Sequence, residues 1–223
     1  MRAVAVAALV IGLAACGPSS ASPDREDSLR YVALGDSYTI GTSVSAAESW
    51  PSQLVARVHE LQLVANLGVN GYTSADVIDH QLPALTALEP EFITLLIGVN
   101  DVVQGVPEAA YAANVETILD GVLEVVAGNR VVCVATPDYT VTPQGAAFGS
   151  PDQQRAGIER FNRRLGELCA ARGIRFAPEI FAISEAAATD RSLIAVDGLH
   201  PSGAQYALWV DAIQPGVEEL LRE

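Results

Sequence analysis

Three short segments that lie far apart in this chain contain the residue types of an acyl-transfer catalyst. They are Gly35-Asp36-Ser37-Tyr38-Thr39, Gly98-Val99-Asn100-Asp101 and Asp197-Gly198-Leu199-His200-Pro201. A serine hydroxyl can attack a carbonyl carbon when a histidine takes its proton, and an aspartate can orient that histidine. An amide N–H can stabilise the negative charge that develops on the carbonyl oxygen. Together the segments would supply the serine, the amide and the Asp/His pair.

The first two segments each follow an apolar run that is typical of a buried strand. Residues 31–34 precede Gly35, and residues 92–97 precede Gly98. In an open parallel α/β sheet, the loops that leave the carboxyl ends of the strands line the ligand crevice. Residues that are distant in the sequence can therefore meet at this edge of the sheet.

The rest of the chain predicts alternating strands and helices, which is the pattern of a doubly wound parallel sheet. The strand candidates are rich in Val, Ile and Leu, as in strands covered on both faces, and span residues 31–34, 63–67, 92–97, 130–135 and 174–177. The helix candidates span residues 50–61, 74–81, 107–126, 151–172 and 201–221. Prolines at predicted helix starts fit this assignment, whereas Pro215 predicts a kink or break in the last helix.

The first residues are typical of a bacterial export signal. Arg2 precedes an apolar run over residues 3–15 that is too short to span a bilayer as a helix, which suits a signal peptide. The segment Leu13-Ala14-Ala15-Cys16 resembles the bacterial lipobox, which implies cleavage before Cys16 and lipidation of its sulfur. An ordinary secretory signal with an unrelated cysteine is the alternative. Both interpretations predict an exported protein, and lipidation would anchor it to a membrane of the bacterial cell envelope.

The chain is thus predicted to have three parts. Residues 1–15 are a lipoprotein signal peptide, residues 16–28 a flexible tether, and residues 29–223 one catalytic domain. The tether is small, polar and contains proline, so it cannot bury apolar surface. Hydrophobic residues make up 50% of the chain, which is enough for one sizeable core.

The composition excludes several other classes of function. A formal net charge of −14 gives a surface that repels polyphosphates, so nucleic acid is not an expected partner. The sequence contains no lysine, which excludes a Walker A loop and a Schiff-base lysine, and no G-x-G-x-x-G dinucleotide loop. His59, His80 and His200 are not spaced as metal ligands. We expect neither a metal nor a cofactor.

Two cysteines remain besides Cys16. Cys133 lies in a strand candidate, and Cys169 lies on the apolar side of a helix candidate. An exported protein permits a disulfide between them. Two buried thiols fit the sequence equally well.

The three segments with catalytic residue types, together with the segment around Gly71, resemble the sequence blocks of the SGNH hydrolases, also called the GDSL esterase/lipase family. Gly35-Asp36-Ser37 matches the first block, with Tyr38 in place of its leucine, and Gly71 matches the glycine of the second. Asn100 matches the third block, G-x-N-D, and Asp197 and His200 match the D-x-x-H of the last. Each block alone is weak, but four in this order are specific and cover essentially the whole predicted domain. The resemblance implies a three-layer α/β/α fold of the flavodoxin-like type with a five-stranded parallel sheet.

The resemblance also implies a role for each matching residue. Ser37 would be the nucleophile, His200 the general base, and Asp197 the residue that orients the His200 ring. The backbone N–H groups of Ser37 and Gly71 and the side-chain amide of Asn100 would form the oxyanion hole. Activity should then fall as His200 becomes protonated, near an ordinary histidine pKa of about 6.5. Asp36 and Asp101 are expected to bond nearby backbone amides and to brace their loops.

These expectations describe a serine esterase of the lipase/acylhydrolase or carbohydrate deacetylase type, which works without a metal or cofactor. Its substrate would be a small-molecule, lipid or carbohydrate ester with a short acyl group. Residues 40–49, 104–107 and 136–150 are expected to shape the acyl pocket. Two alternatives remain: a surface lipoprotein that uses the same fold only for binding, and an acyltransferase that passes the acyl group to a sugar hydroxyl. The oligomeric state is left open.

Overall fold

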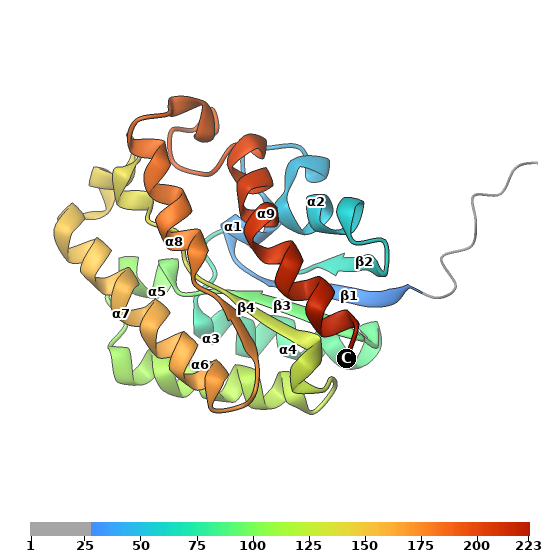
Figure 1. Ribbon diagram of the computed structural model, residues 1–223. Helices are drawn as coiled ribbons and strands as arrows, with labels where there is room; N and C mark the ends of the chain where they lie inside the picture. The colour runs from blue at the N-terminus through green and yellow to red at the C-terminus, as the bar shows by residue number, and fades with distance from the viewer. Residues whose placement is uncertain (1–27) are drawn as a thin grey trace, which may run out of the picture.

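Five parallel strands form the central sheet of the protein (Figure 1). The structure is a computed structural model in which residues 28–223 are described. The strands are β1 (Leu29–Gly35), β2 (Leu61–Asn66), β3 (Phe92–Leu96), β4 (Val131–Val134) and β5 (Arg175–Ala177). They pair in the order β2-β1-β3-β4-β5, and each neighbouring pair is parallel. This is the flavodoxin-like strand order, so the predicted fold class is confirmed.

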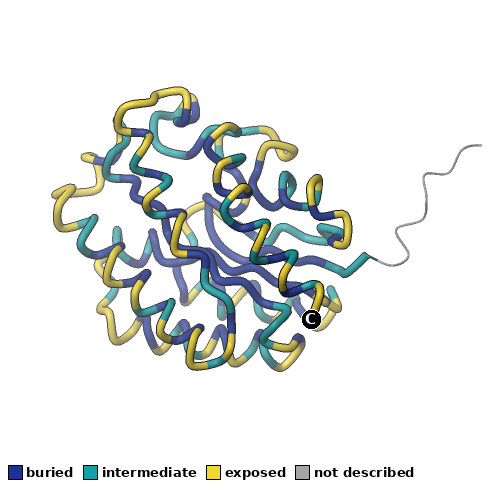
Figure 2. The backbone as a smooth tube through the Cα atoms, viewed as in Figure 1, coloured by how far each residue is buried: buried dark blue, intermediate teal, exposed yellow. Residues whose placement is uncertain are grey.

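Helices cover both faces of this sheet, because successive residues of each strand point to opposite faces. In β1, Tyr31 and Ala33 contribute to one hydrophobic core, and Val32 and Leu34 contribute to the other. The first core is closed by α2 (Trp50–Arg57), α8 (Glu179–Ser184) and α9 (Gly203–Leu221). The second is closed by α4 (Leu82–Leu88), α6 (Glu108–Leu123) and α7 (Pro151–Ala170). The buried strands between two outer layers of helices are visible in Figure 2.

The predicted helix over residues 50–61 is wrong at its carboxyl end. Helix α2 stops at Arg57, and Val58 already has an extended backbone. Leu61 is fully buried and pairs with Leu29 at the start of the β1–β2 ladder. Burial in the sheet therefore overrides the helical tendency of this apolar residue.

The single helix predicted over residues 74–81 is instead the beginning of a longer, interrupted one. It consists of α3 (Ser74–Asp76), a wide π turn (Val77–Gln81) and α4. The Leu82 N–H donates to the carbonyl of Val77, five residues earlier, and Pro83 has no N–H to donate. Gln81, the last residue of this turn, is buried and bonds the backbone of Gly35 and Leu67.

Pro215 does not break the last helix. Helix α9 runs from Gly203 to Leu221 with Pro215 inside it. Trp209, Ile213 and Val217 of the same helix are buried against the sheet. Their packing holds the helix together across the hydrogen bond that proline removes.

Cys133 and Cys169 are free thiols, and both are fully buried. Of the two alternatives drawn from the sequence, the structure therefore selects buried thiols over a disulfide. No helix among residues 28–223 combines the length and the apolar character needed to span a bilayer. The predicted signal peptide, its lipidation site at Cys16 and residues 17–27 of the tether lie outside the described residues.

Candidate active site

Ser37 lies at the turn between the end of β1 and the short helix α1 (Ser37–Ile40), and it is 6% exposed. Asp36 caps this helix, because its Oδ1 accepts a hydrogen bond of 2.9 Å from the Tyr38 N–H. Gly35 before it has φ +150°, and a Cβ there would lie 2.3 Å from the carbonyl oxygen of Leu96. Only glycine allows this tight exit from the strand. The sequence Gly-Asp-Ser thus places a serine hydroxyl at the carboxyl edge of the sheet.

Asp197 and His200 form the predicted pair. The His200 Nδ1 lies 2.6 Å from Asp197 Oδ2, and Asp197 Oδ1 accepts the Leu199 and His200 N–H groups at 2.9 and 3.0 Å. Partial burial alone raises the pKa of the Asp197 carboxyl. Hydrogen bonds from the Ser43 hydroxyl, the His200 ring and these two backbone amides outweigh that effect and hold the pKa well below its usual range. Asp197 is therefore a stable carboxylate that fixes the ring of His200.

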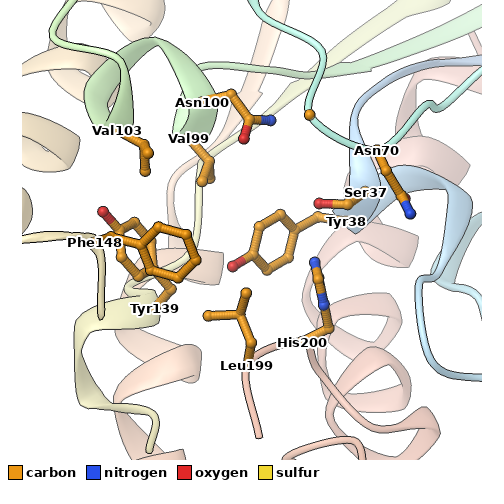
Figure 3. A pocket seen from close by; sticks show the side chains of 11 residues that line it. Ser37, Tyr38, Asn70, Val99, Asn100, Val103, Tyr139, Phe148, Leu199 and His200 are labelled. Carbon is orange, nitrogen blue, oxygen red and sulfur yellow. The ribbon is translucent and has the colours of Figure 1, made fainter. Parts of the chain in front are cut away.

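Ser37 and His200 line the same cavity, and Figure 3 shows the imidazole ring directed toward the serine side chain. With Nδ1 held by Asp197, Nε2 is the ring nitrogen left for the serine. Within residues 28–223 no hydrogen bond joins the two side chains in this structure. Such bonds often tighten only when the substrate is present.

The three predicted oxyanion donors converge on this cavity, because Ser37, Gly71 and Asn100 all line it. Among the described residues, neither the Ser37 N–H nor the Gly71 N–H donates to a protein acceptor. Gly71 has φ +82°, and a Cβ at this position would meet no protein atom within 4 Å. The Asn100 amide nitrogen donates one bond of 2.9 Å to the Tyr72 carbonyl. Its second N–H makes only a long contact of 3.5 Å, to Asp36 Oδ2.

Asn100 is held by the element on which it lies. It belongs to α5 (Val99–Val103), which begins directly after the end of β3. The next residue, Asp101, is fully buried, and its carboxylate accepts hydrogen bonds from the Ser74 N–H at 2.9 Å and the Ser74 hydroxyl at 2.5 Å. Burial raises the pKa of Asp101, and the bonds from Ser74 act against that rise. Asp101 braces its loop, as the sequence predicts.

Asp36 is also fully buried, next to Asn100. Its Oδ2 lies 3.5 Å from the Asn100 amide nitrogen. Desolvation raises the pKa of this carboxyl to about 7, against the effect of the bond from the Tyr38 N–H, and nearby Asp101 raises it further. The predicted role of Asp36, a bond to a nearby backbone amide, is confirmed by that bond from Tyr38.

The cavity next to Ser37 has a volume of about 160 Å³. Much of its lining is apolar and aromatic, and consists of Tyr38, Val99, Val103, Tyr139, Phe148 and Leu199. The Tyr139 and Phe148 rings meet edge to face with centroids 5.5 Å apart, and Figure 3 shows both across the cavity from Ser37. This wall can bind an uncharged organic group rather than a polar one.

The predictions for the acyl pocket are partly correct. Residues 136–150 contribute Tyr139 and Phe148, as expected. Residues 104–107 do not line the cavity, because helix α5 presents Val99 and Val103 instead. Residues 40–49 do not line it either, although one of them, Ser43, contacts Asp197.

The sequence did not indicate a role for two residues that support the site. Gln81 is buried, accepts the Gly35 N–H at 2.9 Å, and donates to the carbonyls of Gly35 and Leu67 at 2.7 and 2.8 Å. Asn66 donates to the Thr39 carbonyl at 2.8 Å and accepts the Gly68 N–H at 3.0 Å. Both residues tie the exit of β2 to the serine turn. No local pattern marks them, because each acts through contacts with distant segments.

Comparisons with known proteins agree with this geometry. The profile of the GDSL-like Lipase/Acylhydrolase family matches residues 33–208. The crystal structure of TesA is similar with a TM-score of 0.67 at 20% identity, covering 86% of this chain and 99% of that one. Axe2, an acetylxylan esterase from Geobacillus stearothermophilus, gives 0.66 at 19% identity over 85% and 94%. A member of the lipolytic G-D-S-L family from Veillonella parvula gives 0.68 at 15% identity over 83% and 96%. No curated protein matches the chain.

Proposed function

Since this chain belongs to the GDSL-like lipase/acylhydrolase family and is an SGNH-type ester hydrolase, we propose that it cleaves carboxylic esters through an acyl intermediate on Ser37. The observation that carries the proposal is the convergence of Ser37, His200, Gly71 and Asn100 on one cavity. These residues come from four separate segments of the chain. Residues needed only for packing would be expected to contact the core instead of lining one open cavity together.

The reaction begins when the Ser37 hydroxyl attacks the ester carbonyl and His200 Nε2 accepts the proton. The imidazolium that forms lies 2.6 Å from the Asp197 carboxylate, which stabilises its charge. The developing oxyanion is met by the two free backbone N–H groups, at Ser37 and Gly71, and by the Asn100 amide. Ser37 is also the first residue of α1, so its N–H has no partner within that helix.

Collapse of this intermediate breaks the bond between the carbonyl carbon and the alcohol oxygen. His200 returns its proton to the departing alkoxide, so that the alcohol leaves neutral and the acyl group stays on Ser37. Water then attacks the acyl-enzyme, again with His200 as the base, and the carboxylic acid is released with the serine hydroxyl restored. The nucleophile, the base and the proposed oxyanion donors in these steps all come from residues that line the one cavity.

A fluorescent organophosphonate tests the nucleophile directly. We expect it to label the wild-type protein and to fail on Ser37→Ala and His200→Ala. Ser52→Ala, on helix α2, and His80→Ala, whose side chain is exposed, are the matched controls and should label normally. Wild-type protein that stays unlabelled while folded would contradict the proposal and favour a binding protein with the same fold.

The acyl group that this cavity accepts is proposed to be short. A cavity of about 160 Å³ compares with the roughly 150 Å³ of an apolar cavity that holds benzene, so it has room for about six carbon atoms. The likeness to Axe2, an acetylxylan esterase, supports a short acyl group as well. Comparison of kcat/KM for p-nitrophenyl esters from acetate to dodecanoate should show a maximum at or below hexanoate. A maximum at dodecanoate would contradict this size.

We also retain the lipid anchor at Cys16 as a proposal, on the strength of the Leu13-Ala14-Ala15-Cys16 segment alone. Bacterial cells expressing the full chain with an alkyne-tagged palmitate should incorporate the label, and Cys16→Ser should abolish incorporation. Cys133→Ser is the matched control, because that thiol is buried in β4. Equal labelling of the Cys16→Ser variant would contradict the anchor and leave an exported protein with an ordinary signal.

A further inference from the structure

The turn after helix α1 contacts Asp197, the residue that orients His200. Helix α1 ends at Ile40 with Gly41 as its C-cap, and the chain then continues through Thr42 and Ser43. The Ser43 hydroxyl donates a hydrogen bond of 2.6 Å to Asp197 Oδ2. This is the same oxygen that faces His200 Nδ1 at 2.6 Å.

Ser43 makes this contact from an unusual backbone conformation. Its φ is +68°, and among residues 28–223 only Ser43 and Glu89 have a positive φ without being glycine. Glycine would adopt this angle without strain. Ser43 is also exposed, so packing does not require a serine here. What the serine adds over glycine is the hydroxyl that meets Asp197.

We propose that Ser43 is a positioning residue for His200, acting through the Asp197 carboxylate. The inference rests on the proposed function, because it concerns the same site. Asp197 Oδ1 is held by two backbone amides, and Oδ2 by Ser43 and the His200 ring. With both oxygens held, the carboxylate cannot rotate away from the ring. His200 is then kept in the tautomer with its proton on Nδ1, which leaves Nε2 as the base.

The same turn is bonded to the nucleophile. The Gly41 and Thr42 N–H groups both donate to the Ser37 carbonyl at 3.1 Å. The Thr42 hydroxyl also bonds the Asn70 side chain at 2.5 Å, next to the oxyanion residue Gly71. Because the same turn bonds both Ser37 and Asp197, the Ser43 hydroxyl should move together with Ser37. The distance between Ser37 and His200 is then preserved.

Ser43 acts without touching the substrate, since it does not line the cavity. Its loss should lower kcat and leave KM nearly unchanged. A residue that only stabilised the fold would change neither kinetic constant of the folded enzyme. A residue that bound substrate would change KM.

The deciding variant is Ser43→Gly, which removes the hydroxyl and suits the backbone angle. We expect kcat for an activated aryl ester to fall about tenfold, as for the loss of a hydrogen bond to a charged group, with KM within about twofold and no loss of thermal stability. Glu89→Gly is the matched control, because it relaxes the same kind of angle at the end of α4, away from the site. It should leave kcat and KM at the wild-type values.

A double-mutant cycle with Asp197→Asn shows through which residue Ser43 acts. If the effect passes through the carboxylate, Ser43→Gly should lower kcat by less than about twofold in the Asp197→Asn background. A full tenfold loss in that background, or unchanged kcat for Ser43→Gly alone, would overturn the inference. Ser37→Ala separates this failure from failure of the proposed function, because it removes activity only if Ser37 is the nucleophile.

Discussion

Two segments with nearly the same sequence, each following a strand, line the cavity next to Ser37 but differ in local structure. Gly68-Val69-Asn70-Gly71 follows β2, and Gly98-Val99-Asn100-Asp101 follows β3. These strands flank β1 in the sheet, so the two exits lie on either side of Ser37. Both asparagines and Gly71 line the cavity. In the first exit we propose the backbone N–H of Gly71 as the oxyanion donor, since it has no protein acceptor among the described residues. In the second we propose the side-chain amide of Asn100, which also bonds the Tyr72 carbonyl.

The difference comes from the segment that the chain enters after each exit. After β3 the helix α5 begins at Val99, so Asn100 lies on a helix whose next residue, Asp101, is buried and bonded to Ser74. After β2 the chain stays non-helical until Ser74, and Asn70 is exposed and bonded to Thr42. We therefore propose that the asparagine of the second exit is the oxyanion donor, whereas Asn70 lines the cavity with its side-chain oxygen already bonded to Thr42. Long-range packing decides between the two roles.

The sharpest test of this contrast is Asn100→Ala. Removal of one oxyanion donor typically costs a hundredfold to a thousandfold in kcat, and we expect a loss of about that size here. KM should change little, because the bond to the substrate oxygen strengthens only as charge develops. Steady-state kinetics with p-nitrophenyl acetate give both constants. A loss below about fivefold would remove Asn100 from the oxyanion hole.

The sequence predicts the strands and the motif residues well, but not the long-range contacts around them. The strands and the matching blocks around Ser37, Asn100 and His200 are local signals, because apolar runs and short motifs are read within a few residues. Ser43 is different: it meets Asp197 across 154 positions of sequence, and nothing near it marks the contact. The sequence predicts residues 104–107 in the pocket wall instead of Val99 and Val103, because the short helix α5 has no clear helical pattern.

Asp36 lies beside Asn100 and offers a test by pH. Its pKa is raised by burial to about 7, so its neutral form favours folding, and its contribution to stability should be lost as the pH rises from about 4 through 7. The slope for one such group is at most about 1.4 kcal/mol per pH unit. We expect the free energy of unfolding of the wild type, measured in urea, to fall relative to that of Asp36→Asn over this range. Asparagine keeps a side-chain oxygen for the Tyr38 N–H.

The ionisation of Asp197 does not interfere with this measurement, because its contribution to the free energy of unfolding depends on pH with the opposite sign. Its pKa is lowered, so its stabilising effect is complete above the ordinary aspartate pKa and is lost only as the pH falls below it. Between pH 5 and about 7.5 the difference between wild type and Asp36→Asn therefore isolates Asp36. A difference that is flat with pH would show that Asp36 is ionised in the folded protein throughout this range.

Gly71→Ala should have a smaller kinetic effect than Asn100→Ala. An alanine Cβ meets no protein atom at this position, so the disturbance comes from the backbone angle of φ +82° and from the methyl group beside the substrate. A shift of the Gly71 N–H by a few tenths of an ångström weakens one donor without removing it. We expect kcat/KM for the acetate ester to fall about tenfold. An unchanged kcat/KM would exclude this N–H from the oxyanion hole.

The smallest effect is expected for Asn70→Ala, the counterpart of Asn100→Ala in the other exit. Asn70 lines the cavity, but it is exposed and its side-chain oxygen accepts the Thr42 hydroxyl, so we expect its loss mainly to loosen the loop next to Gly71. We expect kcat with p-nitrophenyl acetate to fall by less than about threefold, roughly 0.6 kcal/mol. If Asn70→Ala instead matched the loss of Asn100→Ala, both asparagines would act on the substrate and the two exits would be equivalent. A small loss beside a large one would establish that the packing after each strand, and not the shared Gly-Val-Asn sequence, creates the donor.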